Sequence, residues 1–178
     1  MAMKTRRTKP RRQRGLTLIE QLMTVAVLAV LAGLGLPSFV GLLSRHRLQT
    51  SGLDLFATLQ YARATAITQR RAVIVCPTVD ARQCSNGVEW TTGWLVGADH
   101  DRDGQIDDAP LRSSSGHPGL FIHGSSGRRL VRFLPDGSAA GSNLTLSLCT
   151  HDGHKALKVI VSNAGRVRMA DQEGNTCG

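Results

Sequence analysis

Acidic residues alternate along one polar segment of the sequence and could together bind a cation. The alternating residues and the glycine after them are Asp99, Asp101, Asp103 and Gly104. This pattern matches the opening of an EF-hand loop, in which oxygens converge on calcium and the glycine allows a sharp turn. The match fails at the twelfth position, where Pro110 replaces a bidentate Glu, and Asp107 and Asp108 are imperfect substitutes. The alternative is a solvated hairpin loop rich in Asx turns, so we assign no metal or cofactor and leave calcium binding open.

Two arginines near the end of the chain could bind phosphate groups. On a strand, Arg166 and Arg168 project to the same face, while Val167 points into the core. Two neighbouring guanidinium groups suit adjacent phosphates. Other basic residues that we expect to extend this patch are Lys155, Lys158, Arg128, Arg129 and Arg132. The alternative is a solvated strand face whose arginines pair with Asp171 or Glu173.

A single acid interrupts a long apolar segment near the N-terminus. Between Leu16 and Leu36 the only charged side chain is Glu20, and the segment has about the length that a helix needs to cross a bilayer. A carboxylate there is costly unless it is paired, so we predict a functional role for Glu20. The basic residues before Gly15 keep that end in the cytoplasm by the positive-inside rule. A secretory signal peptide cleaved near residues 32–33 is the alternative.

An amphipathic helix and a run of strands must position these groups. After Pro37 the apolar residues fall on one helical face, formed by Leu48, Leu55, Leu59, Ala62 and Ala66. Proline predicts a kink at residue 37, or alternatively two helices joined by a turn at residues 36–38. From Ala72 the pattern changes to short β-rich runs separated by turn residues. The predicted strands cover residues 72–76, 88–96, 120–123, 130–134, 144–149, 157–161 and 166–169. We therefore expect an α+β fold in which the helix packs on antiparallel sheet.

The four cysteines predict two disulfides in an exported domain. We pair Cys76 with Cys84, which bracket a turn-rich segment, and Cys149 with Cys177 at the C-terminus. A zinc site is the alternative, although no Cys-x-x-Cys spacing occurs.

The charge of the chain is misleading when it is taken as a whole. The formal net charge is +9, but seven of the 22 Lys and Arg residues precede Gly15. The remainder carries 15 basic and 13 acidic residues, with seven acids and two bases in residues 72–110. The net charge of the chain therefore does not indicate a protein whose whole surface binds nucleic acid. No nucleophile elbow or paired catalytic acid is present, so we predict that the chain is not an enzyme.

The N-terminal segment resembles the class III signal of type IV prepilins and pseudopilins. The resemblance is carried by Gly15-Leu16-Thr17-Leu18-Ile19-Glu20 and by Pro37, with Leu16 standing where the family usually has Phe. It implies that a prepilin peptidase cuts between Gly15 and Leu16, that the Leu16 amine is methylated, and that Glu20 pairs with the amine of a neighbouring subunit.

The remainder of the chain resembles the GspH/FimT group of pseudopilins and minor pilins. The motifs that carry the resemblance are Cys76-Pro77, Gly93-Trp94-Leu95-Val96, the acidic loop, Val131-Arg132-Phe133 with Pro135-Asp136-Gly137, and Gly165-Arg166-Val167-Arg168. In FimT-like minor pilins the last motif is associated with DNA binding, which the resemblance carries to Arg166 and Arg168. A purely structural pseudopilin H, contacting other minor pseudopilins and the secreted substrate, is the alternative.

The resemblance also implies an organisation and a location for the chain. The expected segments are a cleaved leader at 1–15, a transmembrane and filament-core helix at 16–37, an amphipathic helix at 38–71 and a periplasmic β domain at 72–178. The protein would be a single-pass inner-membrane protein that joins other pilins or pseudopilins in a helical filament, near its tip.

Overall fold

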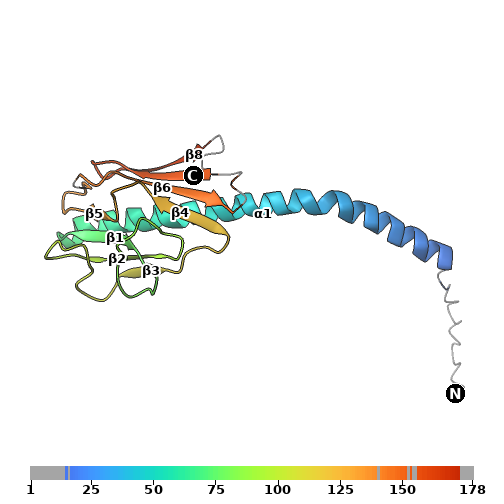
Figure 1. The fold of residues 1–178 in the computed structure, drawn as a ribbon, viewed down its shortest axis with the longest axis horizontal. Coiled ribbons are helices and arrows are strands. Elements are labelled where there is room, and N and C mark those ends of the chain that lie inside the picture. The colour runs from blue at the N-terminus through green and yellow to red at the C-terminus, as the bar shows by residue number, and fades with distance from the viewer. Residues whose placement is uncertain (1–14, 16, 140, 152, 154–155, 173–178) are drawn as a thin grey trace, which may run out of the picture. The chain divides into compact units, whose positions relative to one another are not determined.

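One long helix precedes all the strands in the part of the chain that the structure describes. The computed structural model describes residues 15, 17–139, 141–151, 153 and 156–172. Helix α1 (Leu18–Gln69) begins the fold. The strands that follow are β1 (Val73–Pro77), β2 (Trp94–Ala98), β3 (Arg112–Ser114), β4 (Leu120–Gly124), β5 (Val131–Phe133), β6 (Leu144–Thr150), β7 (Ala156–Val161) and β8 (Val167–Gln172). The predicted α+β class is confirmed (Figure 1).

The strands form two antiparallel sheets. The first has the order β3-β2-β1-β5 and the second the order β4-β6-β7-β8. In the second sheet Val161 of β7 lies opposite Val167 of β8. Among the described strands β8 pairs with β7 alone and is therefore an edge strand. An isolated bridge between Glu89 and His123 joins the loop before β2 to β4. All pairings are antiparallel, including that of β1 with β5, which are far apart in the sequence.

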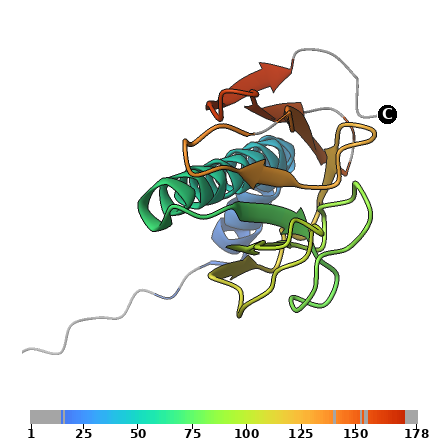
Figure 2. The same cartoon turned by 90° about the vertical axis from the view of Figure 1, so that its left-hand side faces the viewer.

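The chain divides into two compact units after Gly41. In the second unit the apolar stripe of α1 lies in one hydrophobic cluster with residues of both sheets, and Figure 2 shows the helix beside their strands. The predicted stripe is confirmed, because its residues are at most 6% exposed: Leu48, Leu55, Leu59, Ala62 and Ala66. Each buried Leu contributes about 1.5–3 kcal/mol of hydrophobic free energy relative to an exposed one.

The two central strands of the first sheet are buried on both faces, whereas the edge strand β3 is largely exposed. Every residue of β1 and β2 is buried. One face joins the main core, while Ile74, Cys76 and Leu95 form a second small cluster with Cys84, against which Ile106 packs. This explains why β1 and β2 are nearly continuous apolar runs instead of alternating sequences.

The N-terminal unit contains the first part of α1, and its large apolar side chains are exposed. Those of residues 18–31 are between 58% and 78% exposed. The helix continues through Pro37, so the alternative of two helices joined by a turn is wrong. Over the described residues, no helix has a stretch both long and apolar enough to cross a membrane.

Two strand predictions were wrong. Residues 88–96 were expected to form one strand, but β2 begins only at Trp94, because a turn at residues 91–92 precedes Gly93 with its positive φ of 141°. Strand β3 was missed because its sequence, Arg-Ser-Ser, has little β propensity, and its pairing with β2 fixes its conformation.

Two turns, at Gly137 and at Gly165, contact each other and α1, and the second turn leads directly into β8. Gly165 has φ +75°, and a Cβ atom there would lie 1.9 Å from the carbonyl oxygen of Gly137. The same carbonyl accepts a hydrogen bond of 2.9 Å from Nε of Arg63 on α1. Only glycine fits at residue 165 without moving this arrangement, which directly precedes Arg166.

We predict that Gly165→Ala is much more destabilising than Gly127→Ala. Both positions have positive φ, but a Cβ at Gly127 meets no atom of a described residue within 4 Å. The left-handed backbone alone costs about 1–2 kcal/mol, and the contact with Gly137 adds about 1–3 kcal/mol. Urea unfolding of the two variants measures the difference, and equal losses would contradict the steric explanation.

Candidate functional site

Glu20 lies in the first turn of α1, directly after the predicted processing site. The Thr17 hydroxyl accepts a hydrogen bond of 3.4 Å from the backbone N–H of Glu20, so Thr17 caps the helix. The Thr-x-x-Glu spacing is a capping-box signal that could have been read from the sequence. Gly15 and Glu20 are exposed, while Leu16 lies outside the described residues. Cleavage, methylation and the role of Glu20 stay predictions.

Arg168 of β8 and Arg166, which directly precedes this strand, lie on the outer face of the second sheet, and we call them the β8 arginines. Arg166 and Arg168 are exposed, and Val167 between them is only 6% exposed. Arg168 pairs in register with Ile160 of β7, two residues from Lys158. These three basic residues therefore belong to one sheet face. Lys155 lies outside the described residues.

Neither arginine is neutralised by a described residue. No ion pair joins Arg166 or Arg168 to any residue in the part of the chain that the structure describes. Asp171 is an odd number of positions away, so strand alternation puts it on the opposite face, where it lines a depression with Leu157 and Met169. The predicted alternative of pairing with Asp171 is thereby removed, and Glu173 is not among the described residues.

The other arginines named from the sequence do not extend this patch. Arg132 belongs to β5 of the first sheet, and with Arg128 and Arg129 it lines a separate depression beside Arg102 and Gly104. The expectation that Arg132 joins the β8 arginines is wrong, because β5 belongs to the other sheet. Arg128 and Arg129, in the loop between β4 and β5, line this depression.

A groove of about 650 Å³ lies on the same outer face as the β8 arginines. Phe121, His123 and Lys158 line it, together with the polar side chains of β6. His123 lies 2.9 Å from Glu89 and its ring is stacked on Phe121 at a centroid distance of 6.4 Å. The groove combines an exposed aromatic ring with a lysine and was not predicted from the sequence, because its residues come from separate strands.

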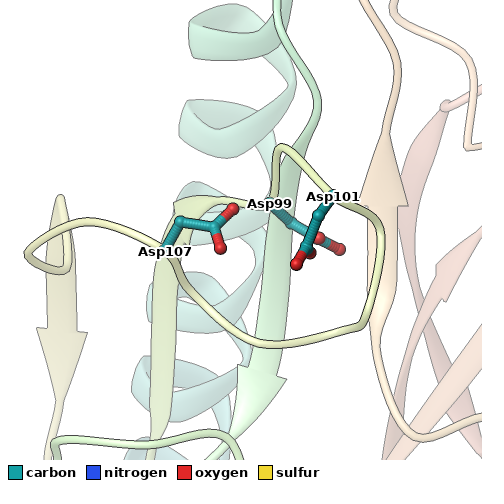
Figure 3. Close-up of side chains that lie close together, drawn as sticks. All are labelled: Asp99, Asp101 and Asp107. Atoms are coloured by element: carbon teal, nitrogen blue, oxygen red, sulfur yellow. The ribbon is translucent and has the colours of Figure 1, made fainter.

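The acidic loop brings together three carboxylates, though not the three that alternate in the sequence. Asp99, Asp101 and Asp107 can each place one oxygen within 4.8 Å of the others. Figure 3 shows Asp101 and Asp107 approaching from opposite sides of the loop, with Asp99 between them. Asp103 instead accepts a hydrogen bond from the N–H of Gln105. The predicted Asp99-Asp101-Asp103 set is therefore corrected to one that includes Asp107.

Asp99 forms a buried ion pair with Arg132 across the first sheet. Asp99 is fully buried, and its Oδ2 accepts hydrogen bonds from the guanidinium of Arg132, with 3.1 Å to Nε and a second bond from a terminal nitrogen. The same guanidinium donates to the carbonyl of Arg102. The pair holds the acidic loop against β5.

The structure contains a disulfide between Cys76 and Cys84, which closes the loop after β1. In that loop the backbone N–H groups of Arg82 and Gln83 donate to Asp80 and hold the pKa of its carboxyl below the ordinary value. Cys149 is also disulfide-bonded. Cys177 lies outside the described residues, so the pairing of Cys149 with Cys177 stays a prediction.

Two family models match the chain. The model described as type II transport protein GspH matches residues 53–165, and that of the prokaryotic N-terminal methylation motif matches residues 10–36. A search of curated proteins found no match.

Solved structures of pilin-like proteins are similar to this chain. The type IV minor pilin FimU of Pseudomonas aeruginosa strain PAO1 is 28% identical, with a TM-score of 0.58 over 71% of this chain and 90% of FimU. A second crystal form gives a TM-score of 0.56 over 69% and 92%. The minor pseudopilin EpsH from the Type 2 Secretion System of Vibrio cholerae is 16% identical, with a TM-score of 0.51 over 70% and 97%, and is alike in fold alone.

We predict that Arg132→Met lowers the free energy of unfolding by about 3–5 kcal/mol, because it leaves the buried Asp99 carboxylate without its partner. The exposed Arg129 offers a matched control, and Arg129→Met changes stability by less than about 0.5 kcal/mol. The double variant Asp99→Asn/Arg132→Met regains part of the loss because no buried charge remains. Urea unfolding measures all three, and similar losses for the two single variants would refute the prediction.

Proposed function

Because this chain belongs to the GspH family of type II transport proteins, we propose that it is a membrane-anchored filament subunit with a DNA-binding outer face. The family comprises minor pilins and pseudopilins of type IV pili or type II secretion systems. In the proposal a prepilin peptidase cuts between Gly15 and Leu16, and the following helix anchors the chain in the inner membrane with the globular unit in the periplasm. The mature subunit then joins other pilins near the filament tip and performs no catalysis.

The filament role is supported by the exposed apolar segment of α1, which begins with a lone acid. All large apolar side chains from Leu18 to Leu31 are exposed in the isolated chain, and a helix that is apolar all round needs lipid or other helices to cover it. Processing creates a positive amine at Leu16, close to the positive end of the helix dipole. In an apolar surrounding neither that amine nor Glu20 is stable alone, so a pair between subunits lowers the free energy of assembly.

We predict that Glu20→Ala is processed normally but assembles into filaments at less than about a tenth of the wild-type level, because several kcal/mol of pairing are lost. Gln21→Ala is a control that alters the adjacent exposed position without removing a charge. Immunoblots of membranes and of sheared filaments measure processing and assembly separately. Wild-type levels of Glu20→Ala in filaments would overturn the proposal.

The DNA-binding role is supported by the unpaired arginines of β8. Arg166 and Arg168 project from one face, carry no ion pair with a described residue, and lie on the face that contains Lys158 and the groove with Phe121. Guanidinium groups so arranged can contact successive phosphates without reading bases, so binding would be weak, salt-sensitive and independent of sequence. Lys155 is included in the proposed site on the basis of the sequence.

We predict that Arg166→Ala/Arg168→Ala weakens binding of a labelled DNA duplex about tenfold at low salt and reduces the salt dependence by about two counterions. Fluorescence anisotropy with the mature chain in detergent measures this, because the precursor's basic leader would itself bind DNA. Arg128→Ala/Arg129→Ala removes the same charge elsewhere and leaves affinity within about twofold. If both double variants bind like the wild type, the structural pseudopilin that contacts other subunits and secreted substrate is favoured instead.

A further inference from the structure

We propose that Asp99, Asp101 and Asp107 form a calcium site that fastens the loop between β2 and β3 to the first sheet. One oxygen from each carboxylate can lie within 4.8 Å of the other two, which is the spacing of oxygens around one cation. The site is separate from the outer face of the second sheet and is independent of the filament role. Its ligands differ from those of an EF-hand, since Asp107 replaces Asp103 and Pro110 supplies no carboxylate.

A buried oxygen without a hydrogen-bond partner points to a missing ligand. Asp99 is fully buried, and its Oδ1 has no hydrogen-bond partner among the described residues, while its Oδ2 is occupied by Arg132. An unsatisfied carboxylate oxygen in the protein interior costs free energy and requires an explanation. A cation held between Asp99, Asp101 and Asp107 would remove that cost.

The other two carboxylates also retain one oxygen each that accepts no hydrogen bond from a described residue. Asp101 uses Oδ1 to accept from the N–H of Asp103, and Asp107 uses Oδ2 to accept from the N–H of His100. These bonds orient both carboxylates and leave Oδ2 of Asp101 and Oδ1 of Asp107 available. With Oδ1 of Asp99, three anionic oxygens are therefore open to one ion.

The loop that carries these residues is held in place at its middle. The side-chain amide of Gln105 bonds both the N–H and the carbonyl of Cys84, at 3.2 and 3.4 Å. Ile106 packs on the cluster that contains the disulfide, and Gly104 supplies a turn with φ +89°. The ligand residues are thus largely preorganised, which reduces the entropy lost on binding.

The charges around the site favour a divalent cation. Arg132 neutralises one of the three carboxylates, and the neighbouring Asp108 is paired with Arg71 and His100. The formal charges of Asp103 and the exposed Arg102, which are neighbours on the same loop, cancel. Two negative charges therefore remain among the three ligands.

Oxygen ligands in an irregular arrangement fit calcium better than magnesium. Magnesium requires near-ideal octahedral geometry and retains its water, whereas calcium accepts six to eight oxygens with varied geometry. Three carboxylates supplemented by water resemble the weaker calcium sites of extracellular modules, whose Kd values lie at about 10⁻⁴–10⁻³ M.

The test is thermal unfolding of the full chain in detergent, with and without 10 mM calcium chloride, at constant ionic strength. If the Kd is about 1 mM, this calcium concentration raises the midpoint temperature of unfolding by about 3–6 °C. Asp101→Asn should reduce the shift to less than about 1 °C. Asp103→Asn is the matched control, because it removes the same charge from the same loop while keeping an acceptor for Gln105, and it should retain the shift.

Three outcomes would overturn the calcium site. The wild-type protein could show no shift and no heat in calorimetric titration with calcium. Asp103→Asn could lose the shift as fully as Asp101→Asn, which would mean a diffuse response to negative charge. Magnesium could match calcium at equal concentration, which would mean that the loop attracts any divalent ion without a built site.

Discussion

The apolar stripe of α1 is buried against both sheets, and the arrangement of the globular unit depends on this contact. Leu55, Leu59, Ala62 and Ala66 are fully buried in one cluster with the inner residues of both sheets. Two of the four are alanines, which lets the strand side chains approach the helix axis closely. Polar contacts then orient the helix: Asp54 accepts hydrogen bonds from Arg112 and Ser114 of β3, and Arg63 donates to the Gly137 carbonyl.

From this shared core, each sheet presents a different outer face. The first sheet has its outer face covered by loops, with the disulfide and Ile106 packed on Ile74 and Leu95. No described segment covers the outer face of the second sheet, where the groove and the β8 arginines lie. A covered face can hold a rigid loop with ordered carboxylates, and an open face can contact a large polymer. The two proposed binding sites therefore follow from the same two-sheet architecture.

The sequence predicted the features that depend on local periodicity. The helical stripe recurs every three or four residues, and alternation along β8 correctly separated Arg166 and Arg168 from Val167. Features that depend on distant residues were not predictable. Strand β3 exists because β2 pairs with it, and the carboxylate set includes Asp107 because the loop folds back to bond His100. Likewise, the strand pattern gave no sign that Arg132 would be held by Asp99, 33 residues earlier in the chain.

Pairing, and not the number of basic residues, distinguishes the arginines that can bind a partner. Arg112 and Arg132 form ion pairs with Asp54 and Asp99 and contribute to the fold. Arg166 and Arg168 have no such pair among the described residues, and an unpaired guanidinium loses less on binding phosphate because no protein contact must be broken. Their place on an edge strand has a second effect, since charged side chains there discourage edge-to-edge association of sheets. The same charges can thus keep the exposed edge soluble and attract a polyanion.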